Sequence, residues 1–308
     1  MGASAMRRVR YSTLPTERPN RASRGLDRLP PLAVIDLMNR EDARAVASVG
    51  RVKRAIARAV GLLSHSLAVG GRVFFVGAGT SGRLGVMEAA ECPPTFNTSP
   101  ALVQAIMAGG RQSVFRSREG AEDREGEARR EIRRRVRRGD VVVGIAASGV
   151  TPFVRAALAE AKRREAVTVL IAMNAKSPLR SLATVLIAPR VGPEVLAGST
   201  RLKAGTATKM ILNMLTTASI ARLGKVYGNL MVDLRPSSRK LRARGLGLVE
   251  VIGGVSLTRA QRCLRASGGH TKTAIVMARF GVSAREARDR LAVAGGHLRR
   301  CLEQSVNA

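Results

Sequence analysis

The stretch RVFFVGAGTSGRLG, residues 72–85, decides the fold that we predict for this chain. Its apolar run is typical of a short buried strand, and a helical pattern follows the glycines and hydroxyl residues. Gly77 and Gly79 let the backbone come close to an anion, while Thr80 and Ser81 offer hydroxyl groups at a helix N-terminus. We expect a phosphate-binding turn here, with a plain tight turn between strand and helix as the alternative.

A second loop repeats this chemistry. The segment IAASGVTPFV places Ser148 and Thr151 directly after another predicted strand, although a helix cap would explain these residues equally well. The first loop lacks the GK[ST] ending of a P-loop, and no acidic residue is clearly placed to hold a ribose, which argues against a nucleotide. Two hydroxyl-rich loops after two parallel strands favour one phosphate held between them.

The remaining pattern predicts an α/β fold with a doubly wound parallel sheet, because short apolar runs alternate with helical patterns. Ligands of such sheets bind beyond the carboxyl ends of the strands. A long helix is expected over residues 31–69, with a break near residues 40–42 as the alternative. A nearly all-apolar helix is expected over residues 201–224, buried in the core or at a subunit interface. The further predicted strands are 102–107, 140–147, 167–172 and 183–188.

Three parts are predicted along the chain: an N-terminal arm at residues 1–30, an α/β domain at 31–238 and a C-terminal helical domain at 239–308. The last part contains a repeat with a period of 27 residues, in which Ser256–His270 aligns with Ser283–His297. Each unit has the pattern of a helix, a Gly-Gly stop and the start of another helix. Because His270 and His297 occupy equivalent positions, we interpret both as structural.

The high positive charge of the chain could be taken as a sign of nucleic-acid binding. The net charge is +31, but the 45 arginines are spread through all 308 residues, which indicates a compositional bias. The densest run, residues 129–138, is expected to be a solvated helix face, with an anion-binding surface as the alternative. Aromatic residues make up only 3%, so we predict no specific nucleic-acid partner.

No membrane contact and no metal site are expected. The longest apolar runs stop well short of the roughly 18 residues that a membrane span needs, and no apolar region follows the first arginines, so we predict a cytoplasmic protein. The three cysteines and three histidines are far apart and lack the spacing of metal ligands or of a disulfide framework.

Acidic residues near the first loop suggest acid–base chemistry, which needs one group that takes a proton and one that gives it. Glu91 lies in ECPP, where two prolines would fix its position, although a plain surface glutamate is the alternative. Glu119 and Glu122 in EGAED are expected to share a helix face, where acids in a first turn would also stabilise the helix dipole.

A third helix start combines hydroxyl groups with positive charge. The segment GPEVLAGSTRLKAGT carries Ser199, Thr200 and Lys203 just before the long apolar helix. These residues suit either a sugar phosphate or an interface.

The chain closely resembles the N-acetylmuramic acid 6-phosphate etherases, which are SIS-domain proteins related to the glucokinase regulatory protein. The resemblance runs from TERPN near residue 16 to the tail, and VGAGTSGRLGVMEAAECPPTF, EGAED, GSTRLKAGTA and GKVYGNLMVD are its most specific motifs. It implies a SIS-type sugar-phosphate fold, a homodimer with sites near the subunit boundary, and no cofactor. The chain departs from the family pattern at Val150, Ala175 and Ser238–Arg239.

The resemblance also implies a reaction, in which the D-lactyl ether is cleaved by elimination and then hydration to give N-acetylglucosamine 6-phosphate and D-lactate. Carried over by motif, Glu91 is the acid and Glu122 the base, so we expect environments that separate their pKa values. The substrate-binding residues would be Gly79, Thr80, Ser81, Glu119, Ser148, Thr151, Ser199, Thr200 and Lys203. A silent sugar-phosphate sensor and a DNA-binding SIS regulator are the alternatives, and the short, proline-rich arm argues against the second.

Overall fold

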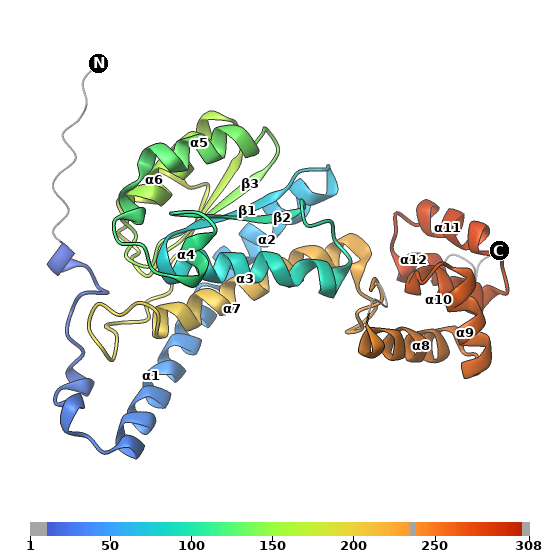
Figure 1. Cartoon of the computed structure of the whole chain (residues 1–308), viewed down its shortest axis with the longest axis horizontal. Coiled ribbons are helices and arrows are strands. Elements are labelled where there is room, and N and C mark those ends of the chain that lie inside the picture. The colour runs from blue at the N-terminus through green and yellow to red at the C-terminus, as the bar shows by residue number, and fades with distance from the viewer. Residues whose placement is uncertain (1–10, 235–237, 304–308) are drawn as a thin grey trace. The chain divides into compact units, whose positions relative to one another are not determined.

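The computed structural model describes residues 11–234 and 238–303, so the first ten residues of the predicted arm and the last five of the predicted C-terminal domain lie outside the described residues (Figure 1). The chain divides into two compact units. The first comprises Met1–Ala89 and Ala101–Leu215, and the second comprises Ala90–Pro100 and Thr216–Ala308.

The first unit contains one parallel sheet in the order β2-β1-β3-β4-β5. Every strand falls within a stretch that the sequence predicts as buried strand, which confirms the parallel α/β fold. The register aligns Val73 with Val141 and Gly77 with Ile145, so β1 and β3 begin and end at the same levels. The strands are β1 (Val73–Gly77), β2 (Val103–Met107), β3 (Val141–Ile145), β4 (Val167–Ile171) and β5 (Val185–Ile187).

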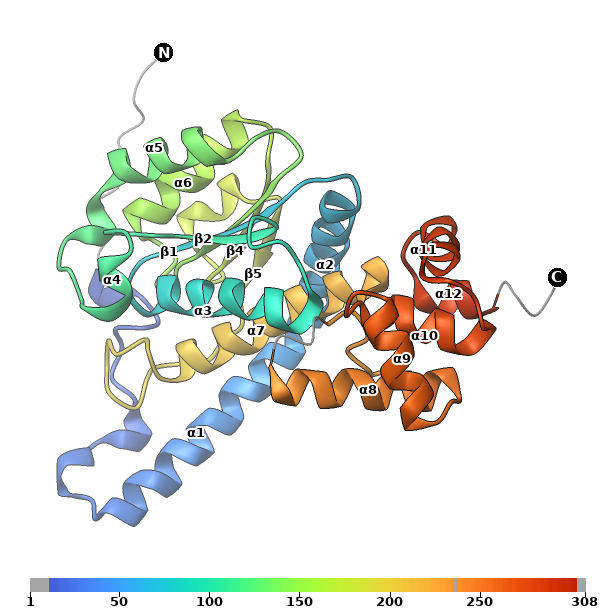
Figure 2. The same cartoon turned by 45° about the vertical axis from the view of Figure 1, so that its right-hand side comes forward.

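Helices cover both faces of this sheet, as expected for strands that are apolar on both sides. Phe74 and Val76 of β1 pack with Phe153 and Leu158 in one buried cluster. Helices α5 (Glu125–Arg135) and α6 (Pro152–Arg163) lie on that face, whereas α3 (Gly79–Phe96) and α7 (Lys203–Ile220) run along the opposite face (Figures 1 and 2). The connecting turns are α4 (Gln112–Phe115) and the 3-10 turns Tyr11–Thr13, Arg21–Ser23, Leu26–Arg28, Ala121–Asp123 and Pro178–Leu182.

The long helix predicted over residues 31–69 is in fact two helices, α1 (Pro31–Arg51) and α2 (Lys53–Ala68). The break lies at Val52, where φ is −105° and ψ is 14°, and the prediction of a break at residues 40–42 is wrong. The polar stretch does not interrupt the helix, since arginine, glutamate and alanine are good helix formers. Within it, Glu41 is only 2% exposed and forms a buried ion pair with Lys203. Because Lys203 is so far along the chain, the burial of Glu41 could not be predicted from the sequence around it.

The apolar helix predicted over residues 201–224 is confirmed as α7, which is followed by a π-type turn at Ala221–Lys225. Gly224 has φ +72° in this turn and ends the helical path, as expected. Ile211, Leu212 and Leu215 are fully buried, whereas Met214 is 41% exposed, so one side of the helix belongs to the core and another is open.

The second unit ends in a helical region that contains the repeat. Ser256 and Ser283 are the N-cap residues of equivalent helices, and both Gly-Gly pairs have positive φ, from 61° to 82°. His270 occupies the N-cap position of α10 without a side-chain cap hydrogen bond, and His297 directly precedes α12. The helices are α8 (Arg239–Gly253), α9 (Leu257–Ala266), α10 (Thr271–Phe280), α11 (Ala284–Val293) and α12 (Leu298–Glu303).

The arginine run of α5 makes intramolecular contacts. Arg133 donates to Glu160 at 3.0 Å, and Arg134 pairs with Glu131 at 2.9 Å. Arg135 donates to the carbonyl oxygen of Ala105 and lies over the ring of Phe74. Within residues 11–234 and 238–303, no helix is both long and apolar enough to cross a membrane.

The same substitution at two glycines should change stability in opposite directions. A Cβ atom at Gly144 of β3 would lie 2.7 Å from Val154 Cγ1, whereas one at Gly61 of α2 would meet nothing within 4 Å. We expect Gly144→Ala to lower the free energy of unfolding by about 1–3 kcal/mol through overpacking. Gly61→Ala should raise it by about 0.5–1 kcal/mol, because alanine is the better helix former. Urea titration measures both, and a stabilised Gly144→Ala variant would contradict the packing described here.

Candidate active site

A pocket of about 550 Å³ opens where the strands of the first unit end. Its walls include the loops that follow β1, β2 and β3, and β1 lies between the other two strands in the sheet. After β1 the chain continues to β2 on one side of it, whereas after β3 it continues to β4 on the opposite side. The loops that follow β1 and β3 therefore lead away from each other. Such a divergence leaves a crevice at the carboxyl edge of a doubly wound sheet, where ligands bind.

The hydroxyl residues of the two predicted loops line this one pocket. Gly79, Thr80 and Ser81 come from the turn after β1, and Ser148 and Thr151 from the loop after β3. The first turn is tight, because a Cβ atom at Gly77 would lie 2.8 Å from the backbone nitrogen of Gly82. The backbone therefore bends sharply into α3 and directs N-terminal N–H groups and hydroxyls toward the pocket, an arrangement suited to an anion.

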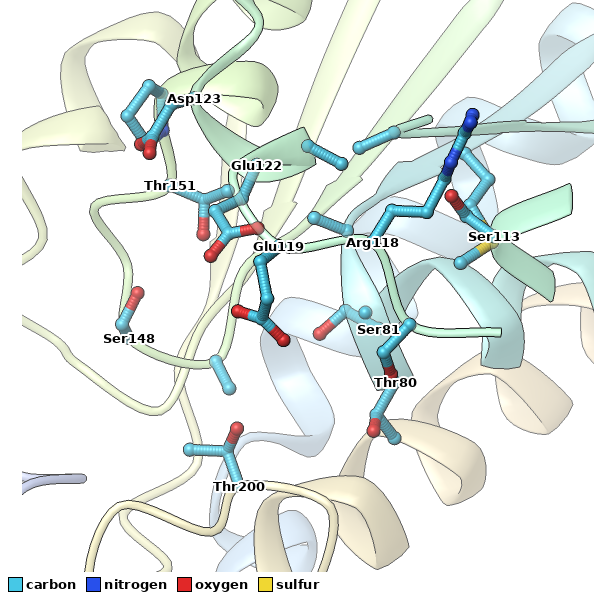
Figure 3. Close-up of a pocket in the computed structure, with 18 of the residues that line it drawn as sticks. Thr80, Ser81, Ser113, Arg118, Glu119, Glu122, Asp123, Ser148, Thr151 and Thr200 are labelled. Atoms are coloured by element: carbon cyan, nitrogen blue, oxygen red, sulfur yellow. The ribbon is translucent and has the colours of Figure 1, made fainter. Parts of the chain in front are cut away.

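Glu119 and Glu122 lie in the middle of the pocket. Figure 3 shows their carboxyl groups near each other, with Ser148 and Thr151 on one side and Thr80 and Ser81 on the other. They occupy a turn and the 3-10 turn Ala121–Asp123, whereas α5 starts at Glu125. The expected common helix face and its first-turn stabilisation are therefore wrong, because the acids at the start of α5 are Glu125 and Glu127.

Two arginines supply positive charge to the same pocket. Arg83 donates to the carbonyl oxygen of Val114 at 2.9 Å and so ties α3 to the segment after β2. Arg118 lies near Ser113 at the end of the pocket away from Ser148 (Figure 3). Val150, one of the positions where the chain departs from the pattern that it resembles, also lines the pocket and is only 8% exposed. The sequence singled out neither arginine, although Arg83 stands inside the TSGRLG turn.

Comparison with known proteins shows the domain type and the family. A model of the glucokinase regulatory protein N-terminal SIS domain matches residues 55–162, and a general SIS domain model matches residues 123–218. An N-acetylmuramic acid 6-phosphate etherase of Symbiobacterium thermophilum is 50% identical over 274 residues, which cover 89% of this chain and 91% of the relative. A protein of the same name from Cutibacterium acnes is 47% identical and covers 94% and 96% respectively.

The chain belongs to the N-acetylmuramic acid 6-phosphate etherase family. Its SIS-type fold is also that of a phosphoheptose isomerase from Francisella tularensis, with a TM-score of 0.51 and 16% identity. That match covers 63% of this chain and 100% of the isomerase. The family membership therefore extends over nearly the whole chain, whereas the likeness to the isomerase concerns the fold alone.

Glu91, the acid that the etherase motif suggests, has a different position from Glu122. It is exposed, lies in the later part of α3, and belongs to the second unit. It is not among the residues that line the pocket. The structure of one chain therefore brings Glu119 and Glu122 together with the hydroxyl loops and leaves Glu91 outside that group.

The segment GPEVLAGSTRLKAGT also places only some of its predicted site residues in the pocket. Thr200 lines the pocket together with Gly198, but Ser199 and Lys203 do not. The Lys203 side chain is only 2% exposed and forms its ion pair with Glu41. Its backbone N–H donates to Glu194, which also accepts from Ala204, at 2.9 Å in each case. Lys203 therefore supports the start of α7, and a direct substrate contact would require this pair to break.

Charge around the pocket is mixed. The pocket carries the carboxyl groups of Glu17, Glu119, Glu122 and Asp123 beside the two arginines. Among the described residues, no group of three histidine, cysteine or acidic side chains is placed to hold a metal ion. Glu17 comes from the segment that the sequence predicts to be an N-terminal arm. It lies in TERPN, where the resemblance to the etherases begins, but was not among the predicted site residues.

The buried ion pair between Glu41 and Lys203 should contribute measurably to the free energy of unfolding. Burial acts to raise the pKa of Glu41, but hydrogen bonds from Lys203 and Asn20 outweigh it and hold that pKa below its usual value of 4.5. We expect Lys203→Met to lower the free energy of unfolding by about 3–5 kcal/mol, because it leaves a buried carboxylate without its main partner. Adding Glu41→Gln should recover part of this loss.

Acid titration gives an independent check of the same pair. Because the folded pKa of Glu41 is depressed, its contribution is complete above pH 4.5 and is lost as the pH falls through the folded pKa. Unfolding curves between neutral and acid pH should therefore show a smaller acid loss in the double variant than in the wild type. Equal acid losses would mean that the pair does not stabilise the fold.

Proposed function

We propose that this protein cleaves the D-lactyl ether of N-acetylmuramic acid 6-phosphate, giving N-acetylglucosamine 6-phosphate and D-lactate in the recycling of cell-wall amino sugars. The observation that carries this proposal is the 50% identity to an etherase over 89% of the chain. The pocket supports it, since the same crevice holds two hydroxyl loops suited to a phosphate and the paired carboxyl groups of Glu119 and Glu122.

The proposed chemistry starts at C2 of the open-chain sugar. The C1 aldehyde makes the C2 proton acidic, and the lactyl oxygen at C3 is in the β position, so removal of the proton allows the C3–O bond to break. Glu122 takes the C2 proton as the general base, and Glu91 protonates the departing lactate as the general acid. Water then adds at C3 of the unsaturated aldehyde, with the two carboxyl groups in reversed roles.

The 6-phosphate is assigned to the hydroxyl loops. Backbone N–H groups at the start of α3 and the hydroxyl of Ser81 supply donors from one side of the pocket, and the hydroxyl of Ser148 supplies a donor from the other. Glu119 lies beside Glu122, between Ser148 and Ser81 in the view of Figure 3, where it can accept hydrogen bonds from the sugar. No cofactor takes part in this scheme, since the aldehyde of the substrate itself stabilises the charge that forms at C2.

A homodimer is part of the proposal. Large apolar side chains remain exposed in the first unit: on α1, Leu32 is 69% and Ile35 is 61% exposed. Met87 and Met214 are exposed on α3 and α7, which the ion pair between Glu88 and Lys209 joins at 3.1 Å. Exposed apolar surface of this kind marks interaction sites, and a second copy of the chain is the occupant that we propose. In that dimer, Glu91 of one subunit serves the pocket of its partner.

The direct test is to incubate the protein with N-acetylmuramic acid 6-phosphate and to measure released D-lactate. Glu122→Gln is nearly isosteric but cannot take the C2 proton, so it should reduce lactate release by at least about 100-fold, the contribution typical of a general base. Exchange of the C2 proton with deuterated water should collapse in parallel. Exchange at the wild-type rate in this variant would exclude Glu122 as the base.

Mixing two inactive variants tests whether the acids come from different subunits. Glu91→Gln and Glu122→Gln chains, unfolded together and refolded, should form mixed dimers in which one site keeps both acids. Lactate release should then reappear, although each variant alone lacks it. Separately refolded and then combined samples serve as the control. If the mixed dimers form but remain inactive, the two acids must come from one chain.

A further inference from the structure

We propose that Glu17 is a further substrate-contacting residue, whose carboxylate accepts hydrogen bonds from the sugar part of the ligand in the pocket. The inference rests on the proposed function only in taking the ligand to be a sugar phosphate. It assigns a role to the segment of residues 14–20, which the catalytic scheme above does not use.

The first observation is the free hydrogen-bonding capacity of Glu17. Its side chain is half-buried and lines the same pocket as Glu119 and Glu122. Oε1 accepts a hydrogen bond from the hydroxyl of Thr16 at 3.0 Å. Within the described part of the chain, Oε2 has no hydrogen-bond partner. An ionised carboxylate can accept about four hydrogen bonds, so Glu17 has capacity left for a ligand.

Contacts on both sides of Glu17 fix its position. The carbonyl oxygen of Thr16, a residue only 1% exposed, accepts a hydrogen bond from the N–H of Gly198 at 3.1 Å. A Cβ atom at Gly198 would lie 3.0 Å from Oε2 of Glu17, so the carboxylate is close against the backbone there. Gly198 also lines the pocket, which places this contact at the wall of the site.

The segment is anchored a second time at Asn20. Its Nδ2 atom donates to Oε2 of Glu41 at 2.8 Å and to the carbonyl oxygen of Pro193 at 3.1 Å. Because Glu41 is also the partner of Lys203, the two segments that carry Glu17 and Gly198 are bound to one buried ion pair. A carboxylate held this way loses little freedom when a ligand binds, so its hydrogen bonds contribute more fully to affinity.

Charge decides which part of the ligand Glu17 contacts. A phosphate would be repelled by a second anion, and the donors suited to it lie in the turn after β1 and the loop after β3. Sugar hydroxyls and an acetamido N–H are donors without charge, and a carboxylate is a strong acceptor for them. Glu17 therefore accepts hydrogen bonds from the sugar, whereas Ser148 donates to the phosphate.

Binding of two ligands distinguishes a contact to the sugar from a contact to the phosphate. N-acetylglucosamine 6-phosphate and inorganic phosphate are each titrated against the protein, and binding is followed by NMR. Glu17→Ala should weaken binding of the sugar phosphate about tenfold or more, as expected for loss of hydrogen bonds to a charged acceptor. Its affinity for inorganic phosphate should stay the same or rise, because a nearby negative charge is removed. Glu17→Gln, which keeps an acceptor without charge, should show a smaller loss for the sugar phosphate.

Matched controls make the result specific. Arg18→Ala changes an exposed neighbour that does not line the pocket, so it should leave both affinities unchanged. Ser148→Ala should weaken both ligands alike, because it removes a phosphate contact. Unchanged sugar phosphate affinity in Glu17→Ala, or a parallel loss for inorganic phosphate, would overturn the proposal. Absence of lactate release by the wild type would instead refute the etherase assignment, and the binding comparison would still decide the role of Glu17.

Discussion

The pairing of β1 with β3 is the constraint on which the site depends. Gly77 and Ile145 are register partners, so both strands end at one level of the sheet and their following loops start side by side. The chain then diverges, since β2 lies on the far side of β1 and β4 on the far side of β3. A crevice is the geometric result. Loops rich in glycine and hydroxyl groups turn that crevice into a place for an anion, because they offer donors without side-chain bulk.

Buried charge links this crevice to chain segments that are remote in sequence. Glu41 and Lys203 are 162 residues apart, and each would be costly to bury alone. Their pairing joins α1 to the start of α7. Burial raises the pKa of the neighbouring Glu194, while the two backbone N–H groups at the start of α7 act in the opposite direction. The walls of the pocket thus depend on groups that do not face it.

Several arginines of this positively charged chain pair with buried acidic side chains. Arg72 donates to the fully buried Asp140 at 2.7 Å, and its guanidinium lies over the ring of Phe74. Arg133 and Arg163 both pair with Glu160, which is only 6% exposed. These contacts use guanidinium groups to cover acidic and aromatic side chains at the ends of the sheet. These arginines therefore serve contacts within the chain.

The sequence by itself determined the elements whose causes are local. Apolar runs predicted all five strands, the Gly-Gly pairs predicted the ends of the repeated helices, and the two hydroxyl loops were recognisable from their residues. Only the tertiary structure decided that α1 continues past residue 42, that Glu119 and Glu122 stand in a turn, and that Lys203 is buried while Glu17 lines the pocket. The physical reason for Glu41, Lys203 and Glu17 is that the contacts that hold them come from segments far along the chain, which local sequence does not show. Gly120, between Glu119 and Glu122, has a positive φ of 71° that the helix pattern did not reveal.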